Sequence, residues 1–316
     1  MVKCVGFDSA TDIDGRDGAR AGITIGAAAP ELDASLRASG NSSLKFTIPS
    51  NSGPDTSGSY FTNFADDLSV QFGENQEFFI QWRQRFSREL LHTKYDGGGG
   101  WKLAVIGTGD RPRKPYASCT ALTVVVNSYY QNGFPVLYNS CTGSTSHGPY
   151  DGFYQSIVGF AGADFRLQNA RRSPYCLYSQ ARTASFFPPD GNCFGYVADE
   201  WMTFQLRIKT GPRVKDEFAN SYVTLWIARE NSPSELVIDW GPYNLTAGDP
   251  ADRQMFGKIW LTPYHTGKSA AQAHPTAYTW YDELIVSRAR IPDPGRAARN
   301  APAVSRAGDC GQSTPC

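Results

Sequence analysis

The clearest pattern in this chain is an alternation with period two between Glu77 and Phe86, with an apolar set and a polar-aromatic set of positions. The apolar positions are Phe78, Ile80, Trp82 and Phe86. The positions between them combine a ring with amide and guanidinium groups, namely Phe79, Gln81, Arg83 and Arg85. Because successive side chains of a strand point to opposite sides of a sheet, the pattern predicts a strand with an apolar back. Its front, with a ring and several hydrogen-bond donors, is chemically suited to a sugar.

Similar patterns recur along the chain and predict about eleven strands of this kind. They fall at residues 44–48, 59–64, 77–86, 101–107, 122–130, 134–140, 201–210, 221–230, 236–240, 258–264 and 277–287. Short helices are expected at 30–38 and 87–95. Strands that have one apolar face each pack as two antiparallel sheets, back to back. The predicted fold is therefore an all-β, two-sheet antiparallel sandwich.

Composition supports this fold class and excludes several functions. The 316 residues include 31 Gly and 20 Pro, which leaves little room for long helices. Thirty basic and thirty acidic residues cancel, so no overall field attracts nucleic acid. No apolar run reaches the roughly 18 residues that a membrane-spanning helix needs, so no membrane insertion is expected.

Changes of composition divide the chain into three parts, the second of which contains a long excursion. Residues 1–40 form an N-terminal segment expected to pack on the sandwich, which spans 41–291. Within it, 142–198 is a long Gly-, Pro- and ring-rich excursion with little periodicity, typical of a functional loop or an insertion. Residues 292–316 form an extended C-terminal tail with little apolar surface. Such a tail is ordered only against a sandwich or a neighbouring subunit, so we expect protein neighbours or a homo-oligomer.

Seven cysteines, an odd number, leave at least one unpaired within the chain. Cys119 and Cys141 lie at the open end of a predicted hairpin that turns near Asn132-Gly133, a position that suits a disulfide. Two further pairs, Cys176 with Cys193 and Cys310 with Cys316, could close small loops. The alternative is free thiols in a reducing cell. Disulfides would indicate an extracellular or otherwise oxidising location. No signal peptide is visible at the start of the sequence.

Three segments together resemble the concanavalin A-like lectin and glucanase superfamily of jelly rolls. They are Ser42-Ser43-Leu44-Lys45-Phe46-Thr47-Ile48-Pro49, the strand from Phe79 to Phe86, and Tyr278-Thr279-Trp280-Tyr281-Asp282-Glu283-Leu284-Ile285-Val286-Ser287. The resemblance covers roughly residues 40–290 and implies a concave sheet that meets a glycan. Its members include lectins, glycoside hydrolases, polysaccharide lyases and glycan-binding virion proteins, so fold leaves function open.

A retaining glycoside hydrolase needs two carboxylates about 5.5 Å apart. The Glu-x-Asp-x-x-Glu pattern of the laminarinase-like members does not occur here. Asp199-Glu200 and Asp282-Glu283 are neighbours in sequence, so their side chains are expected on opposite sides of a strand. The sequence therefore argues against a hydrolase.

A polysaccharide lyase needs a cation or an amide to neutralise the uronate, and a Tyr, His or Lys to move protons. Gln81 and Arg83 could neutralise the uronate, and Tyr264, His265 or Tyr281 could move the proton. The alginate-lyase motifs Arg-x-Glu-x-Arg, Gln-Ile-His and Tyr-x-Lys-x-Gly-x-Tyr are missing, because Arg83-Gln84-Arg85 lacks both the Glu and the spacing. A secreted lyase acting on a uronate-containing glycan is therefore the alternative hypothesis.

Binding without cleavage asks only for rings and hydrogen-bond donors. The residues that meet this description are Phe79, Gln81, Arg83, Arg85, Trp226, Trp260 and Tyr264, although Trp226 and Trp260 could equally belong to the core. The first hypothesis is thus a non-catalytic, carbohydrate-binding jelly roll. We place it outside the cell or on a virion surface, as a decoration or attachment protein.

The loop that contains Asp12, Asp14 and Asp17 is rich in carboxylate oxygens and in glycine, which suits Ca²⁺. It departs from the EF-hand loop, because Gly15 stands at position four and Ile23 at position twelve, where a bidentate Glu is needed. The resemblance to jelly rolls, many of which have a structural calcium, favours this ion. A solvated turn is the other interpretation of the same loop.

Overall fold

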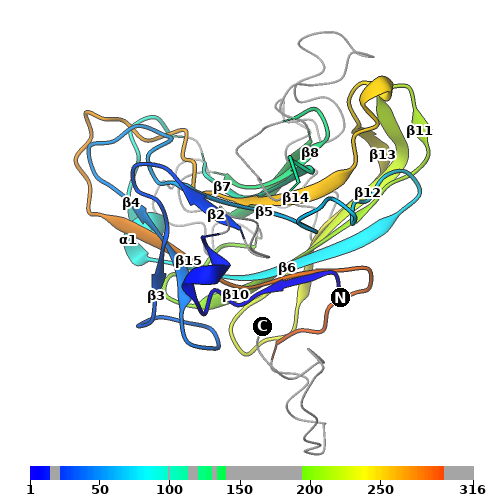
Figure 1. Cartoon of the computed structure of the whole chain (residues 1–316). Coiled ribbons are helices and arrows are strands. Elements are labelled where there is room, and N and C mark those ends of the chain that lie inside the picture. Colours follow the sequence, from blue (N-terminus) through cyan, green and yellow to red (C-terminus); the bar gives the residue numbers. More distant parts are fainter. Residues whose placement is uncertain (15–21, 99, 113–119, 130–133, 140–193, 295–316) are drawn as a thin grey trace, which may run out of the picture.

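The computed structural model describes residues 1–14, 22–98, 100–112, 120–129, 134–139 and 194–294. Within them the chain is a sandwich of two antiparallel sheets, drawn one above the other in Figure 1. The strands are β1 (Lys3–Val5), β2 (Ile23–Ile25), β3 (Glu31–Asp33), β4 (Ser43–Ile48), β5 (Ser59–Asn63), β6 (Glu77–Phe86), β7 (Lys102–Thr108), β8 (Thr123–Tyr129), β9 (Phe134–Asn139), β10 (Trp201–Lys209), β11 (Arg213–Val214), β12 (Glu217–Ala228), β13 (Glu235–Thr246), β14 (Phe256–Leu261) and β15 (Ala277–Ser287). This confirms the predicted all-β sandwich.

The nine-stranded sheet has the order β11-β12-β10-β6-β15-β4-β3, with β13 beside β12 and β1 beside β15. The six-stranded sheet has the order β2-β5-β14-β7-β8-β9. The N-terminal segment therefore supplies strands to both sheets through β1, β2 and β3. Neighbours far apart in sequence pair directly, as β6 does with β10 and β15.

The core lies between the sheets and contains the apolar positions of the alternating strands. On β6, Phe78, Ile80, Trp82 and Phe86 are fully buried in it, as predicted. The rings of Trp82 and Phe204 stack with centroids 5.2 Å apart. Gln84 also points into the core, where its amide accepts from Trp82 Nε1 at 3.1 Å and donates to Thr279 Oγ1 at 3.0 Å. Because its hydrogen bonds are made, this buried amide is tolerated.

The two predicted helices have different outcomes. The helix α1 (Arg88–His92) forms within 87–95, with Ser87 Oγ accepting from the Leu90 N–H at 3.2 Å as its N-cap. The helix predicted at 30–38 is wrong, because residues 31–33 form β3 and pair with β4. After β3 the Asp33 carboxylate accepts from Ser35 N–H at 2.8 Å, which turns the chain instead of continuing a helix.

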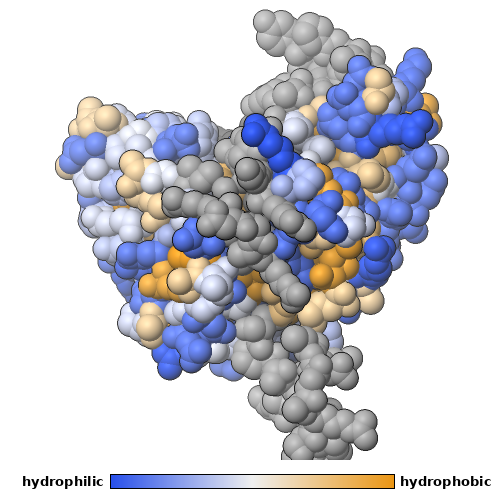
Figure 2. Space-filling model, in the orientation of Figure 1, coloured by the Kyte–Doolittle hydropathy of each residue, from blue (hydrophilic) through white to orange (hydrophobic). Residues whose placement is uncertain are grey.

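The excursion at 142–198 lies outside the described residues up to Cys193. Where the chain is described again, Phe194 and Tyr196 are buried among core rings, and Ala198 forms a bridge to Phe86. No helix in the described part of the chain has the length and apolar character needed to cross a membrane. Figure 2 shows hydrophilic residues over most of this side of the molecule, with hydrophobic groups gathered near its middle.

Candidate functional site

The structure separates the predicted glycan-binding residues onto the two opposite outer faces of the sandwich. Phe79, Gln81, Arg83, Arg85 and Trp226 lie on β6 and β12, in the nine-stranded sheet. Trp260 lies on β14 of the six-stranded sheet and Tyr264 follows that strand. The two groups therefore cannot contact the same sugar ring.

The chain itself covers part of the front of β6. Gln81 is 2% exposed and accepts a hydrogen bond from Gln205 Nε2 at 3.1 Å. The Gln205 amide also donates to the carbonyl of Ile291 at 2.7 Å and accepts from its N–H at 3.1 Å. We call residues 288–294 the C-terminal strap. In Figure 1 it follows β15 along the side of the nine-stranded sheet where β6 and β10 lie.

The strap also reaches the other predicted ring on this face. The guanidinium carbon of Arg290 lies 4.7 Å from the centroid of Trp226. Further along the strap, Asp293 Oδ2 accepts a hydrogen bond from the Ser234 N–H at 3.0 Å. The side of β6 that the sequence suggested for sugar thus contacts the protein's own chain around Gln81 and Trp226.

Other parts of the chain also contact the two arginines of β6. Arg83 Nη1 donates to Ala38 O and pairs with Glu283 Oε2, both at 3.4 Å. Arg85 Nη2 lies 3.8 Å from Asp199 Oδ1. These carboxylates already partner the guanidinium groups, which weakens the case for this face as an anion site.

The expectation that Asp282 and Glu283 face opposite sides is wrong. An irregularity in the pairing of β15 with β6 falls between Asp282 and Ile285, and Glu283 has a φ of 49°. Asp282 lies opposite Arg83, and Glu283 contacts the same arginine. A bulge of this kind breaks strict alternation and brings both carboxylates to one side.

The carboxylate of Asp282 is nevertheless already hydrogen bonded within the protein. It is fully buried and accepts from the N–H groups of Ala38 at 2.7 Å, Ser39 at 3.2 Å and Glu283 at 2.8 Å. Burial raises the pKa of Asp282 to about 7 despite these hydrogen bonds. The residue anchors the segment after β3 onto the sheet.

Two of the residues considered for proton transfer are inside the protein. His265 is fully buried between the rings of Tyr95 and Trp101, and burial lowers its pKa to about 3. Tyr281 is in the core, where its hydroxyl donates to Leu103 O at 2.8 Å and burial raises its pKa. Neither side chain lies on an outer face.

The outer face of the six-stranded sheet offers a different set of groups. Strand register places one residue from each of five strands in a row across it: Phe61, Trp260, Val105, Val125 and Tyr138. Val105, Val125 and Tyr138 form a small apolar cluster against which Trp260 packs. Trp260 is half-buried and its centroid lies 5.2 Å from that of fully buried Phe61. The row is a platform with one partly exposed indole.

Lys102 lies beside this platform. Its Nζ is 5.7 Å from the centroid of Trp260 and 5.0 Å from that of Tyr264. Tyr264 is half-buried, and its carbonyl accepts from the Lys102 N–H at 2.9 Å. Lys102 forms no ion pair with any residue in the described ranges. Burial lowers the pKa of Lys102, against the opposing field of Asp55.

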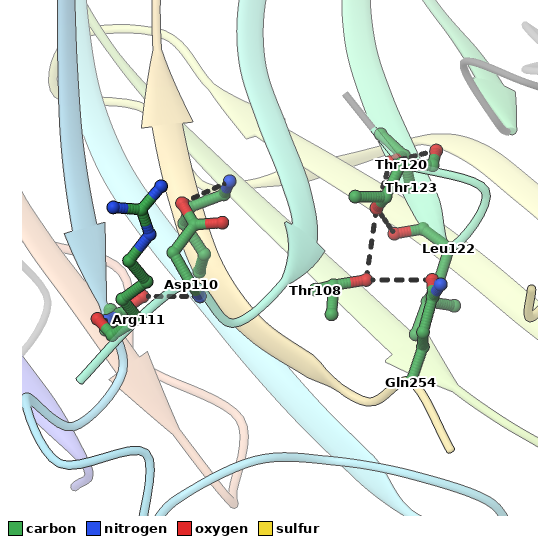
Figure 3. Close-up of polar contacts among 9 residues, drawn as sticks. Thr108, Asp110, Arg111, Thr120, Leu122, Thr123 and Gln254 are labelled. Carbon is green, nitrogen blue, oxygen red and sulfur yellow. Dashed lines mark hydrogen bonds and ion pairs between the residues drawn. The ribbon is translucent and has the colours of Figure 1, made fainter. Parts of the chain in front are cut away.

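At the other end of the platform, polar groups form an ion pair and hydrogen bonds with one another. Lys258 Nζ donates to Asp110 Oδ2 at 2.6 Å, and Asp110 N–H donates to Asn63 Oδ1 at 3.2 Å. Figure 3 shows Asp110 beside Arg111, and Thr108, Thr120 and Gln254 directed at one another in a separate group. Thr108 Oγ1 lies 3.0 Å from Thr120 Oγ1 and 3.1 Å from Gln254 Oε1.

The calcium and disulfide hypotheses stay predictions. Asp12 Oδ2 accepts from Asp8 N–H at 2.8 Å and Ser9 N–H at 3.1 Å, and Asp17 lies outside the described residues. Among the residues that the structure describes, no cluster of three or more His, Cys, Asp or Glu side chains could hold a metal ion. All six cysteines proposed to pair, Cys119, Cys141, Cys176, Cys193, Cys310 and Cys316, also lie outside those residues.

Sequence reasoning missed Lys102 and Phe61. A signal existed for Lys102, which follows Trp101 at the start of a predicted strand whose other residues are apolar. Phe61 had a weaker signal, because burial of a ring in a strand is ordinary. Only the register of β5, β14 and β7 shows that Phe61, Trp260 and Val105 are neighbours.

Comparison with known proteins agrees with this fold. No protein-family model and no curated protein matches the chain. The marine PL-14 alginate lyase from Aplysia kurodai superposes with a TM-score of 0.50 at 11% identity, over 90% of this chain and 98% of that one. The alginate lyase Aly36B gives a TM-score of 0.42 at 14% identity, over 81% and 84% of the two chains. The cellulose-induced protein Cip1 gives 0.40 at 10% identity, over 92% and 99%.

The superposition on the PL-14 alginate lyase supports the fold, and an identity of 11% leaves function to the site. The predicted resemblance to the concanavalin A-like jelly rolls is confirmed at that level. The chain has a jelly-roll sandwich like that of the PL-14 alginate lyase.

Proposed function

We propose that this protein binds an acidic glycan on the outer face of the six-stranded sheet. In this proposal the rings of Trp260 and Tyr264 stack against the sugar, and Lys102 binds its carboxylate. The observation that supports it most directly is an amine that contacts two half-buried rings and forms no ion pair among the described residues. Partly exposed rings beside hydrogen-bond donors are the usual means of binding sugars, and an unpaired cation adds preference for an acid.

The distribution of charge on the two faces supports this choice. On the six-stranded sheet Lys258 is neutralised by Asp110, whereas Lys102 contacts Trp260 and Tyr264. On the nine-stranded sheet Arg83 and Arg85 are each near a carboxylate. An acidic sugar therefore gains more at Lys102, because it does not have to displace a carboxylate there.

Isothermal calorimetry with a glucuronate oligosaccharide and with a neutral glucose oligosaccharide of equal length tests the proposal. We expect the acidic ligand to bind, and Lys102→Gln to weaken its binding about tenfold, the loss of one charge-assisted contact. Arg85→Gln is the matched control on the opposite sheet and should leave the affinity unchanged. The reverse result, with Arg85→Gln harmful and Lys102→Gln neutral, would place the ligand on the nine-stranded sheet and contradict the proposal.

Cleavage is a second candidate function, and one observation favours it. The ring of Tyr264 lies 5.0 Å from Lys102 Nζ, so a phenol stands beside a cation. In a β-elimination the Tyr264 phenolate would take the C5 proton, the C4–O bond would break to form a C4=C5 double bond, and the tyrosine would pass that proton to the leaving oxygen. The ammonium would neutralise the uronate meanwhile.

Incubation with alginate, glucuronan and heparin distinguishes the two functions. A lyase product absorbs in the ultraviolet, and Tyr264→Phe should abolish the rise in absorbance while leaving binding intact. If none of the three polymers gives a rise in absorbance, this second function is contradicted for those substrates and binding without cleavage is favoured.

The position of this protein in a virion, as a decoration or attachment component, is a finer proposal that rests on sequence alone. It would require the protein to be found in purified particles with the glycan-binding face accessible. Labelling of intact particles with antibodies raised against the whole folded protein would test it. Particles that do not contain the protein would contradict it.

A further inference from the structure

Lys102 occupies the ring surface that a sugar would need. Its ammonium contacts both Trp260, the half-buried ring of the platform, and the half-buried ring of Tyr264 beside it. A sugar that stacks on either ring must therefore displace the ammonium or approach beside it. The contact is a cation–π interaction, attractive but weak enough to be exchanged.

The indole is fixed and the lysine is the part that can move. Trp260 contacts buried Phe61 on one neighbouring strand and packs against the Val105 cluster on the other. Lys102 has a flexible four-carbon stem, and its ammonium is held at these two rings by cation–π contacts and not by an ion pair with a described residue. Displacement of the ammonium therefore leaves the platform in place.

We propose that Lys102 determines selectivity between acidic and neutral sugars by covering these rings until a ligand carboxylate draws its ammonium away. This inference rests on the proposed function and deepens it. The carboxylate of an acidic sugar is a new partner for the ammonium, and the sugar can then stack on the ring that the ammonium has left. A neutral sugar must break the cation–π contact and offers only hydroxyl groups in exchange. Selectivity thus includes a penalty against the wrong ligand as well as an attraction to the right one.

The partial burial of Lys102 works in the same direction. A buried ammonium without a carboxylate partner has lost hydration that the rings only partly replace. The lowered pKa of Lys102 reflects this loss. A ligand carboxylate would relieve it, whereas a neutral ligand would not.

Lys102→Met tests the inference, because it keeps most of the stem and removes the charge. Calorimetry of the full chain with the same glucuronate and glucose oligosaccharides should show a loss of at least about tenfold for the acidic ligand. For the neutral ligand we expect a gain of about three- to tenfold, the size of a lost cation–π contact. A simple attractive role for Lys102 would not produce that gain.

Lys209→Met is the matched control. Lys209 Nζ lies 5.8 Å from the Tyr222 ring on the nine-stranded sheet, so the same kind of contact is removed on the opposite face. Neither affinity should change in this variant, and near-ultraviolet circular dichroism should show that both variants are folded. If Lys102→Met loses the acidic ligand without gaining the neutral one, the inference is overturned and the proposed function stands. If the wild-type protein does not bind the acidic ligand, both are overturned.

Discussion

The two outer faces of this sandwich differ in what surrounds single residues, as two tryptophans show. Trp226 and Trp260 are both half-buried tryptophans on outer faces, and the sequence could not rank them. Trp226 lies under Arg290 of the C-terminal strap, whereas Trp260 lies beside Lys102 and Tyr264. Their surroundings, set by segments remote in sequence, assign one to a covered surface and the other to the candidate site.

Replacement of these two tryptophans gives a matched pair of variants. Trp260→Ala should weaken binding of the glucuronate oligosaccharide about tenfold or more, because the stacking surface is lost. Trp226→Ala removes a similar area on the other face and should leave the affinity within about twofold of wild type. Titration of both variants by calorimetry checks this. Equal losses in the two would mean that the effect is one of folding and not of contact.

Two buried titratable residues are expected to act in opposite directions on stability. The pKa of Asp282 is raised from 3.8 to about 7, so the folded state binds its proton more tightly than the unfolded state. The free energy of unfolding therefore rises as pH falls through 7 toward 3.8. The pKa of His265 is lowered from 6.5 to about 3, so its contribution to stability is lost as pH falls from 6.5 toward 3.

The two contributions partly cancel in the wild-type protein between pH 4 and 6.5, the range where about one proton is exchanged at each site. In Asp282→Asn, the pH dependence of the free energy of unfolding should come from His265 alone, so stability should fall more steeply on acidification. In His265→Gln, the pH dependence should come from Asp282 alone, so the free energy of unfolding should rise on acidification. Urea denaturation across this pH range would show it. Parallel curves for wild type and both variants would contradict the assigned pKa directions.

At the scale of elements, alternation predicted the longer strands well, because burial against the opposite sheet imposes it, and missed the short strands β1, β2, β3 and β11. The strands β6 and β15 have the predicted bounds 77–86 and 277–287. Alternation could not reveal the bulge at Asp282 and Glu283, because a bulge adds a residue without any change of composition. It also could not show that the front of β6 is covered, because the strap that covers it is short, polar and more than two hundred residues away.

The strap depends on the side-chain amide of Gln205, which both donates to and accepts from Ile291. Gln205→Ala leaves these main-chain groups without their partner, and we expect a loss of about 1–3 kcal/mol in the free energy of unfolding. Trypsin should then cleave faster after Arg288 or Arg290. Thr203→Ala, on the same strand and face, is the control. Unchanged cleavage in Gln205→Ala would show that other contacts hold the strap.

At the scale of the whole molecule, the sandwich presents two unlike faces. The nine-stranded sheet has the segment after β3 and the C-terminal strap against it, held by Asp282 and Gln205. The six-stranded sheet has the ring platform, with Lys102 on it. The fold class and the glycan hypothesis were accessible from sequence, because both follow from composition and local pattern. The face proposed to bind the glycan could not be predicted from sequence, because it depends on which remote segments cover which sheet.

Hydrogen exchange measured by mass spectrometry, with and without a saturating glucuronate oligosaccharide, tests the proposed binding face most directly. It reports which strands a ligand protects, independently of any substitution. We expect added protection in β7, β14 and the residues around Tyr264, with β6, β10 and β12 unchanged. Protection confined to β6 and β10 would contradict it, because the ligand would then occupy the nine-stranded sheet.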